Sequence, residues 1–197
     1  MKKLILFVMM LVLGIATAAC GSGQTESSAS APAAKSAAPA PKADKKILIA
    51  YFSKSGTTES IAHLLQQQTG GDLFKIETVQ PYPSAYRETT EVAKAEREGN
   101  ARPAIKEPLP DISKYDVVMI GYPIWWHDMP MAVYTFMEKY NFSGKTVVPF
   151  CTSGGSDLAE SLPGFNKSAK GAQILEGLTA NRPADLDPWL VKIGLKK

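Results

Sequence analysis

Three short segments of the sequence combine hydroxyl, glycine and aromatic residues in patterns that could bind one ligand. The first reads Ser53-Lys-Ser55-Gly56-Thr57-Thr58 and lies between an apolar stretch and a predicted helix. Unpaired backbone N–H groups and the helix dipole favour an anion at such a point, the hydroxyls add donors, and glycine permits close approach. Because neither a Walker ending nor a Gly-x-Gly-x-x-Gly turn is present, the segment favours a single phosphate monoester. An ordinary capped helix is the alternative.

The second segment runs from residue 122 to residue 130 and carries Pro123-Ile124-Trp125-Trp126-His127 after another apolar stretch. Two adjacent tryptophans are costly to leave in water and too wide to pack easily inside a short loop. A flat aromatic ligand would explain them by stacking, which is worth ~0.5–1.5 kcal/mol per pair beyond burial. A structural aromatic plug or a patch for a partner protein is the alternative.

The third segment, Thr152-Ser153-Gly154-Gly155-Ser156, can bring backbone N–H groups against the carbonyl oxygens of a polar ring edge. Alone it also fits a plain turn. Taken together, the three segments provide for one phosphate, one stacked ring and one hydrogen-bonding ring edge. That combination of features describes flavin mononucleotide, FMN.

Alternating strands and helices would position these segments. Apolar, β-rich stretches predict strands at residues 47–52, 73–79, 117–122 and 146–151, with a weaker fifth strand at 172–175. Helices are expected from residue 57 to Gly70, at 85–99, at 130–139, after residue 156 and at 189–193. This alternation predicts a doubly wound α/β fold with a parallel sheet between two helical layers. Ligands of such sheets bind where loops leave the carboxyl ends of the strands, which is where the three segments fall.

The three segments resemble those of the flavodoxin family, and the resemblance covers residues 46–197. The branch concerned has an Ala-Tyr-Phe-Ser-x-Ser-Gly-x-Thr loop, a Gly-Tyr-Pro-Ile-Trp-Trp loop and a Pro-Phe-Cys-Thr-Ser-Gly-Gly-Ser loop. The resemblance implies a five-stranded sheet in the order 2-1-3-4-5. It also assigns the phosphate to Ser53, Ser55, Gly56, Thr57 and Thr58, the ring to Pro123, Ile124, Trp125 and Trp126, and the ring edge to Thr152, Ser153, Gly154 and Gly155.

His127 departs from the family pattern, because many members of this branch have glycine after the tryptophan pair. A residue with a Cβ pays ~1–2 kcal/mol for positive φ. We therefore hypothesise that His127 makes the flavin less selective for one-electron transfer. Alternatively it donates a hydrogen bond or proton to reduced flavin, or is a surface residue beside Asp128. Tyr82 and Tyr86 are expected in the core; the alternative is that they shield the ribityl chain or the ring of the flavin.

Cys151 is the one cysteine in residues 46–197. It ends an apolar strand and is expected to be an inert buried thiol. We expect no catalytic side chain and no metal site, because the flavin would carry the chemistry. Three functions stay open: an electron carrier that docks with a redox partner protein, an FMN-dependent NAD(P)H or quinone-type oxidoreductase acting on a small acceptor, and a non-catalytic flavin-binding lipoprotein.

The N-terminus predicts export. Lys2 and Lys3 precede an apolar run that is too short to span a bilayer, so residues 1–19 are expected to be a signal peptide. Cys20 after small residues resembles the lipidation site of bacterial lipoproteins; cleavage after Ala18, releasing the protein, is the alternative. Residues 20–45, rich in Ala, Ser and Pro, predict a disordered linker. The expected location is therefore extracytoplasmic, at a membrane through a lipid anchor.

The net positive charge of the chain comes from this N-terminal region. The formal net charge of the whole protein is +3. Residues 1–45 contain five lysines against Glu26 and Asp44, which accounts for all of it, so residues 46–197 are neutral. A neutral domain gives no indication of nucleic-acid binding.

Overall fold

The computed structural model describes residues 45–196. The predicted signal peptide, the predicted lipidation site at Cys20 and the predicted linker, except its last residue, lie outside this range. Within the described residues, no helix is both long enough and apolar enough to cross a membrane.

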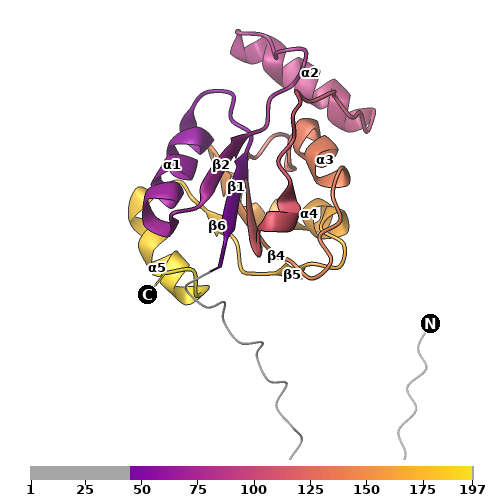
Figure 1. Cartoon of the computed structure of the whole chain (residues 1–197). Helices are drawn as coiled ribbons and strands as arrows, with labels where there is room; N and C mark the ends of the chain where they lie inside the picture. Colours follow the sequence, from indigo (N-terminus) through magenta and orange to yellow (C-terminus); the bar gives the residue numbers. More distant parts are fainter. Residues whose placement is uncertain (1–44, 197) are drawn as a thin grey trace, which may run out of the picture. The chain divides into compact units, whose positions relative to one another are not determined.

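The centre of the fold is a parallel sheet in the order β2-β1-β3-β4-β5, which confirms the predicted order (Figure 1). Its main strands are β1 (Ile47–Tyr51), β2 (Asp72–Lys75), β3 (Val117–Pro123) and β4 (Thr146–Thr152). β1, β3 and β4 are buried along almost their whole length. Continuous apolar sequence is what a parallel strand covered on both faces requires.

The fifth position of the sheet contains two short strands instead of the single strand predicted at residues 172–175. β5 (Gln173–Ile174) pairs with the beginning of β4, and β6 (Leu178–Thr179) pairs with its end. The carbonyls of Val147 and Cys151 accept hydrogen bonds from this edge, so the intervening Pro149 faces it too. Because proline has no N–H to donate, the ladder is interrupted at that point.

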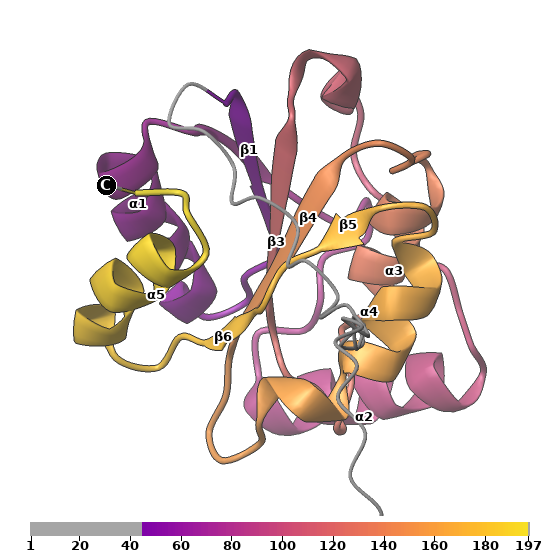
Figure 2. The same cartoon turned by 90° about the horizontal axis from the view of Figure 1, so that it is seen from below.

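Helices cover both faces of the sheet (Figures 1 and 2). α1 (Thr57–Thr69) and α5 (Leu186–Lys192) pack on one face, and α3 (Met131–Glu138) and α4 (Leu162–Ser168) pack on the other. α1 ends at Gly70, which has a φ of 70° and caps the helix as its sequence position predicts. The three layers of the predicted fold are confirmed.

The remaining helix, α2 (Tyr86–Glu98), stands apart at one end of the sheet (Figure 1). It buries only Thr89 and Ala93. The chain that follows it supplies Ile105 and Ile112 to the hydrophobic core, the latter from the short 3-10 helix Ile112–Lys114. This packing leaves α2 free to border the loops at that end of the sheet.

We predict that Gly121→Ala destabilises the fold by ~1–3 kcal/mol, because it would overpack the interior between β3 and β4. A Cβ at Gly121 would lie 2.1 Å from the Cζ of Phe150. Urea unfolding measures the loss, and Phe150→Leu in the same chain should recover part of it by vacating the space. Equal losses with phenylalanine and with leucine at position 150 would contradict this account.

Candidate functional site

Strand register brings the three segments predicted to bind the ligand to the same edge of the sheet. Pro123 at the end of β3 pairs with Thr152 at the end of β4, and the N–H of Ile124 donates to the carbonyl of Thr152 (2.9 Å). The hydroxyl of Thr58, in the first turn of α1, is 2.8 Å from that of Thr152, and both residues are buried. One buried hydrogen bond thus joins the first segment to the third.

The first segment leaves the N-terminus of α1 open to a ligand. Gly56 occupies the N-cap position with a φ of 90°, and no side chain caps the helix. The hydroxyl of Ser53 accepts from the N–H of Gly56 (3.1 Å), which folds the loop back on itself. The hydroxyls of Ser55 and Thr57 lie 3.2 Å apart on the surface. An uncapped helix N-terminus beside exposed hydroxyls is suited to a phosphate.

A cavity of about 580 Å³ opens beside this loop, within the range of small-molecule sites. Seven of the predicted residues line it: Ser55, Thr58, Pro123, Ile124, Trp125, Trp126 and His127. The other seven do not: Ser53, Gly56, Thr57, Thr152, Ser153, Gly154 and Gly155. Lys54 is part of the lining, and no carboxylate is, so the cavity is electrostatically suited to an anion.

α2 forms one wall of the cavity, and the sequence did not predict this role for the helix. Tyr86, Thr89, Thr90 and Ala93 of this helix line the cavity, together with Ser84 and Ser156. The only signal in the sequence was the four-residue spacing of Thr89 and Ala93, which places two small residues on one face of a charged helix. Nothing local indicated that this face would meet the tryptophan loop.

Trp125 is held rigidly at the base of the loop. Its ring packs edge-to-face against Phe52 (centroids 5.3 Å apart) and Tyr82 (5.0 Å). Tyr82 is partly buried against the core, as expected, and donates to Glu96 of α2 (2.6 Å). Burial raises the pKa of both the Tyr82 hydroxyl and the Glu96 carboxyl. Tyr82 and Glu96 therefore link α2 to the tryptophan loop.

Trp126 and Tyr86 lie at the cavity with much of their surface in water. Trp126 is 43% exposed, and its indole N–H donates to the carbonyl of Thr90 (2.9 Å). The ammonium group of Lys94 lies 5.9 Å from the centre of its ring. Tyr86 is 85% exposed, so its expected place in the core is wrong. As the first residue of α2, at the end of the sheet, it has no core to pack against.

The turn that carries Trp126 and His127 adopts a conformation that glycine normally provides. Their φ angles are 50° and 64°. Trp125 and Asp128 close the turn with two mutual backbone hydrogen bonds of 2.9 and 3.0 Å. Each left-handed residue with a Cβ costs ~1–2 kcal/mol. His127 thus takes a positive φ without being glycine, and its effect on electron transfer stays a prediction.

The carboxylate that contacts His127 is not Asp128, the neighbour considered in the sequence. His127 Nδ1 lies 2.5 Å from Glu160, which follows the third segment. Asp128 instead accepts from the Tyr134 hydroxyl (2.8 Å) and from the Met129 N–H (2.7 Å). Contact with the imidazole lowers the pKa of Glu160.

The third segment is folded by its own hydrogen bonds. The Ser153 hydroxyl accepts from the N–H groups of Gly155 (3.1 Å) and Ser156 (2.7 Å). The backbone of Ser153 exchanges two further bonds with the side chain of Asn181. Several groups expected to hold a ring edge are therefore engaged within the protein, and the loop contributes Ser156 to the cavity lining.

Cys151 lies in the interior at the end of β4, as expected. It is fully buried, and burial raises its pKa to about 11. A protonated, inaccessible thiol is not a nucleophile.

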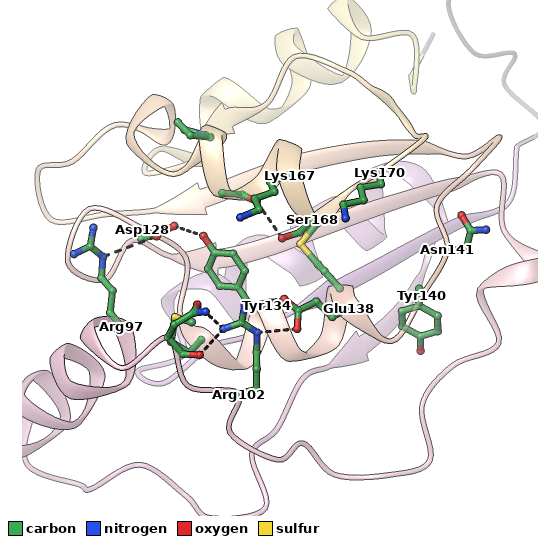
Figure 3. Close-up of a pocket in the computed structure, with 15 residues that line it drawn as sticks. Arg97, Arg102, Asp128, Tyr134, Glu138, Tyr140, Asn141, Lys167, Ser168 and Lys170 are labelled. Atoms are coloured by element: carbon green, nitrogen blue, oxygen red, sulfur yellow. Dashed lines mark hydrogen bonds and ion pairs between the residues drawn. The ribbon is translucent and has the colours of Figure 1, made fainter.

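A second cavity, of about 710 Å³, lies between α3 and α4 (Figure 3). Asp128 lines it, whereas the adjacent Trp126 and His127 line the first cavity, so the tryptophan loop separates the two. Arg97 of α2 lies 3.9 Å from Asp128 at this boundary. Lys167 and Lys170 contribute positive charge from the α4 side.

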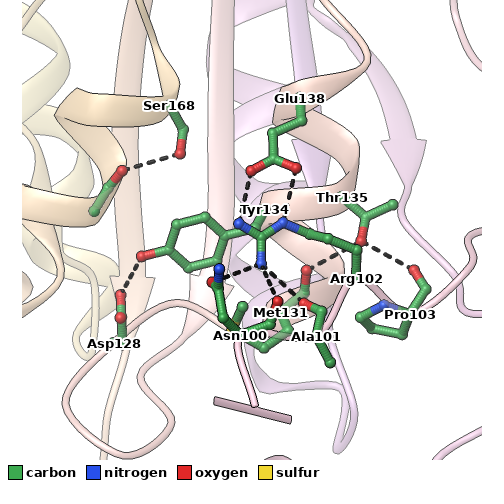
Figure 4. A network of polar contacts seen from close by, with 11 residues as sticks. Asn100, Ala101, Arg102, Pro103, Asp128, Met131, Tyr134, Thr135, Glu138 and Ser168 are labelled. Atoms are coloured by element: carbon green, nitrogen blue, oxygen red, sulfur yellow. Dashed lines mark hydrogen bonds and ion pairs between the residues drawn. The ribbon is translucent and has the colours of Figure 1, made fainter. Parts of the chain in front are cut away.

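Arg102 in this second cavity is a structural residue (Figure 4). Its guanidinium group binds both oxygens of Glu138 at 2.7 Å and donates to the carbonyls of Asn100 and Ala101. It also lies over the ring of Tyr134, 5.1 Å from the centre. With these groups Arg102 fastens the chain after α2 to α3, and its pairing lowers the pKa of Glu138.

The fold and site define an α/β protein with a small-molecule cavity at the carboxyl edge of a parallel sheet. The chain belongs to the flavodoxin family: the model of that family described as "Flavodoxin" matches residues 46–193. A putative flavoprotein from Bacteroides eggerthii is 42% identical, with a TM-score of 0.71, covering 78% of this chain and 100% of that one. A second, from Bacteroides uniformis, is 30% identical, with a TM-score of 0.68, covering 75% and 98%.

More distant relatives share the fold. A flavoprotein from Lactobacillus acidophilus, solved in complex with FMN, is 24% identical, with a TM-score of 0.62, covering 74% of this chain and 98% of that one. Flavodoxin 1 of Escherichia coli K12 is 25% identical over 116 residues, which are 57% of this chain and 52% of that protein. The match thus spans about half the length of this curated relative.

We predict that removing one hydroxyl of the Thr58–Thr152 pair destabilises the protein by ~1–3 kcal/mol, because the other is left buried without its partner. Urea unfolding of Thr58→Val, of Thr152→Val and of the double variant Thr58→Val/Thr152→Val tests this. The double variant should lose less than the sum of the two single variants. Thr57→Val, which changes an exposed hydroxyl, should stay within ~0.5 kcal/mol of wild type. Additive losses would contradict a direct pair.

Proposed function

We propose that the protein binds one FMN at the carboxyl edge of its sheet and carries electrons between partners. The observation that carries the proposal is the cavity itself, with an uncapped helix N-terminus and hydroxyls at one side and an exposed indole at another. These features suit the phosphate and the ring of one ligand. Membership of the flavodoxin family supports the same assignment.

When bound, FMN would supply the redox chemistry, because its ring accepts and releases electrons. The protein's own residues bind and orient. Ser55 and the first turn of α1 would hold the phosphate, and Lys54 adds positive charge nearby. Trp126, fixed by its bond to Thr90, offers a ring face for stacking. The lack of carboxylates in the lining avoids repulsion of the phosphate.

Electron transfer to a partner is favoured over chemistry on a bound substrate. The thiol near the site, Cys151, is buried and protonated at neutral pH. The exposed rings of Tyr86 and Trp126 place aromatic surface at the cavity, where a partner could dock. Since residues 46–197 are neutral, we expect association to depend little on salt.

We predict that the purified protein quenches the fluorescence of added FMN at micromolar concentrations or below. Riboflavin, which lacks the phosphate, should bind at least about tenfold more weakly, because it loses charge-assisted hydrogen bonds worth ~1.5–3 kcal/mol. Trp126→Ala should weaken FMN binding about two- to tenfold through lost stacking. Fluorescence titration measures all three affinities.

Val79→Ala, an exposed apolar residue outside the cavity lining, is the matched control and should bind FMN as wild type does. Unquenched FMN at micromolar protein would reject the site. Steady NAD(P)H-driven turnover by the loaded protein would instead place it among the reductases.

We further propose that the protein acts outside the cytoplasm on a lipid anchor at Cys20. The sequence of the first 20 residues supports this: a positive start, a short apolar run and small residues before the cysteine. Residues 21–44 contain no large apolar side chain and would serve as a tether. Its length as a random coil, on the order of 25–30 Å, would hold the domain clear of the membrane surface.

We predict that the wild-type protein fractionates with membranes and that Cys20→Ala does not become lipidated. Metabolic labelling with a fatty-acid analogue, followed by fractionation, distinguishes the two chains. A wild-type protein that is released without label would show that cleavage follows Ala18 instead.

A further inference from the structure

The strained turn at Trp126 and His127 has a specific structural consequence. Two consecutive positive φ angles suit Asn-Gly sequences, not Trp-His. Such strain persists only where the surroundings hold it, and it concentrates at functional sites. Here the turn places Trp126 and His127 in the lining of one cavity, and His127 also reaches across to Glu160.

The side chain of Glu160 is held in place by a hydrogen bond that does not involve His127. It ends the 3-10 turn Leu158–Glu160, in which its Oε1 accepts from the N–H of Asp157 (3.1 Å). The side chain of Asp157 accepts in return from the N–H of Ala159 (2.8 Å), completing a capping box. One oxygen of Glu160 is thus anchored to the backbone, while the other, Oε2, contacts His127 Nδ1.

This contact determines which ring nitrogen is available. An ionised carboxylate can only accept, so Nδ1 must carry the hydrogen. The lowered pKa of Glu160 keeps its carboxylate ionised at neutral pH. Nε2 has no hydrogen-bond partner among residues 45–196. It can therefore accept a hydrogen bond while the ring is neutral and donate one when the ring is protonated.

We propose that His127 is an acid–base residue of the cavity, acting through Nε2, and that Glu160 is the positioning residue that fixes its tautomer. The ligand class is a heteroaromatic ring with a nitrogen that gains a proton on reduction. FMN belongs to this class, and the proposal therefore rests on the proposed function. When the imidazole is protonated, the proton on Nε2 would be given to the ring of the ligand, which leaves the neutral Nδ1–H form, and a proton from water would replace it. Electrons would come from the redox partner, not from the protein.

Other charged groups surround the turn and share its electrostatic environment. They come from the turn itself, from the cap of the 3-10 turn, from α2 and from the first segment: Asp128, Asp157, Lys94, Arg97 and Lys54. None of these five is in hydrogen-bond contact with the imidazole, whose partner among the described residues is Glu160. A variant at position 160 therefore changes the one direct contact and leaves the surrounding charges in place.

The first experiment reads the tautomer in the protein without flavin. Nitrogen-15 spectra of the imidazoles at pH 8.5, where an ordinary histidine is neutral, should show hydrogen on Nδ1 of His127. Glu160→Ala should shift the population toward the Nε2–H form, because it removes the acceptor that holds the hydrogen on Nδ1. His63, the other of the two histidines, is the internal control and should not change. An unchanged spectrum in Glu160→Ala would overturn the role of Glu160.

The second experiment uses the FMN-loaded protein. The pH dependence of the reduction potential should differ between wild type and His127→Gln, because only the wild-type protein has an acid–base group at this position. Identical slopes in the two proteins would overturn the role of His127. If FMN does not bind, the proposed function and the role of His127 toward a flavin fail together, whereas the tautomer measurement judges Glu160 separately.

Discussion

The buried hydrogen bond between Thr58 and Thr152 is the contact on which the geometry of the site depends. It fastens the first turn of α1 to the last residue of β4, across two strands of the sheet. Pairing of Pro123 with Thr152 adds the tryptophan loop to the same point. Because parallel strands in register end together, three loops from distant parts of the sequence are brought to one edge.

Around this fixed edge, the tryptophan loop is held from two directions. On one side, Trp126 donates to Thr90, and Tyr82 beneath Trp125 donates to Glu96, so α2 is tied to the loop twice. On the other side, His127 reaches Glu160. These contacts compensate for the unfavourable φ angles of Trp126 and His127, since a turn anchored at both sides can retain a conformation that its sequence alone disfavours.

The sequence was sufficient for features that depend on local pattern. Buried strands were visible as apolar runs, Gly70 marked a helix end, and the order of the strands followed from the family resemblance. Features that depend on tertiary contacts were not visible. Tyr86 reads as a core residue, but α2 lies beyond the core, and Glu160 gave no sign that it would meet His127 from 33 residues away. The split of the fifth strand lies opposite Pro149 of the neighbouring strand, where Gly177 packs closely against the proline, and this contact between strands is not visible in the sequence of either one.

The placement of α2 has a further consequence for function. Because Ile105 and Ile112, from the chain that follows α2, belong to the core, α2 can form a wall of the cavity instead of covering the core. A helix that buries only Thr89 and Ala93 contributes little to the stability of the fold, so its position depends mainly on its polar contacts with the tryptophan loop. Access to the cavity and the conformation of that loop are therefore coupled through the same few hydrogen bonds. A ligand that stacks on Trp126 would act on both at once.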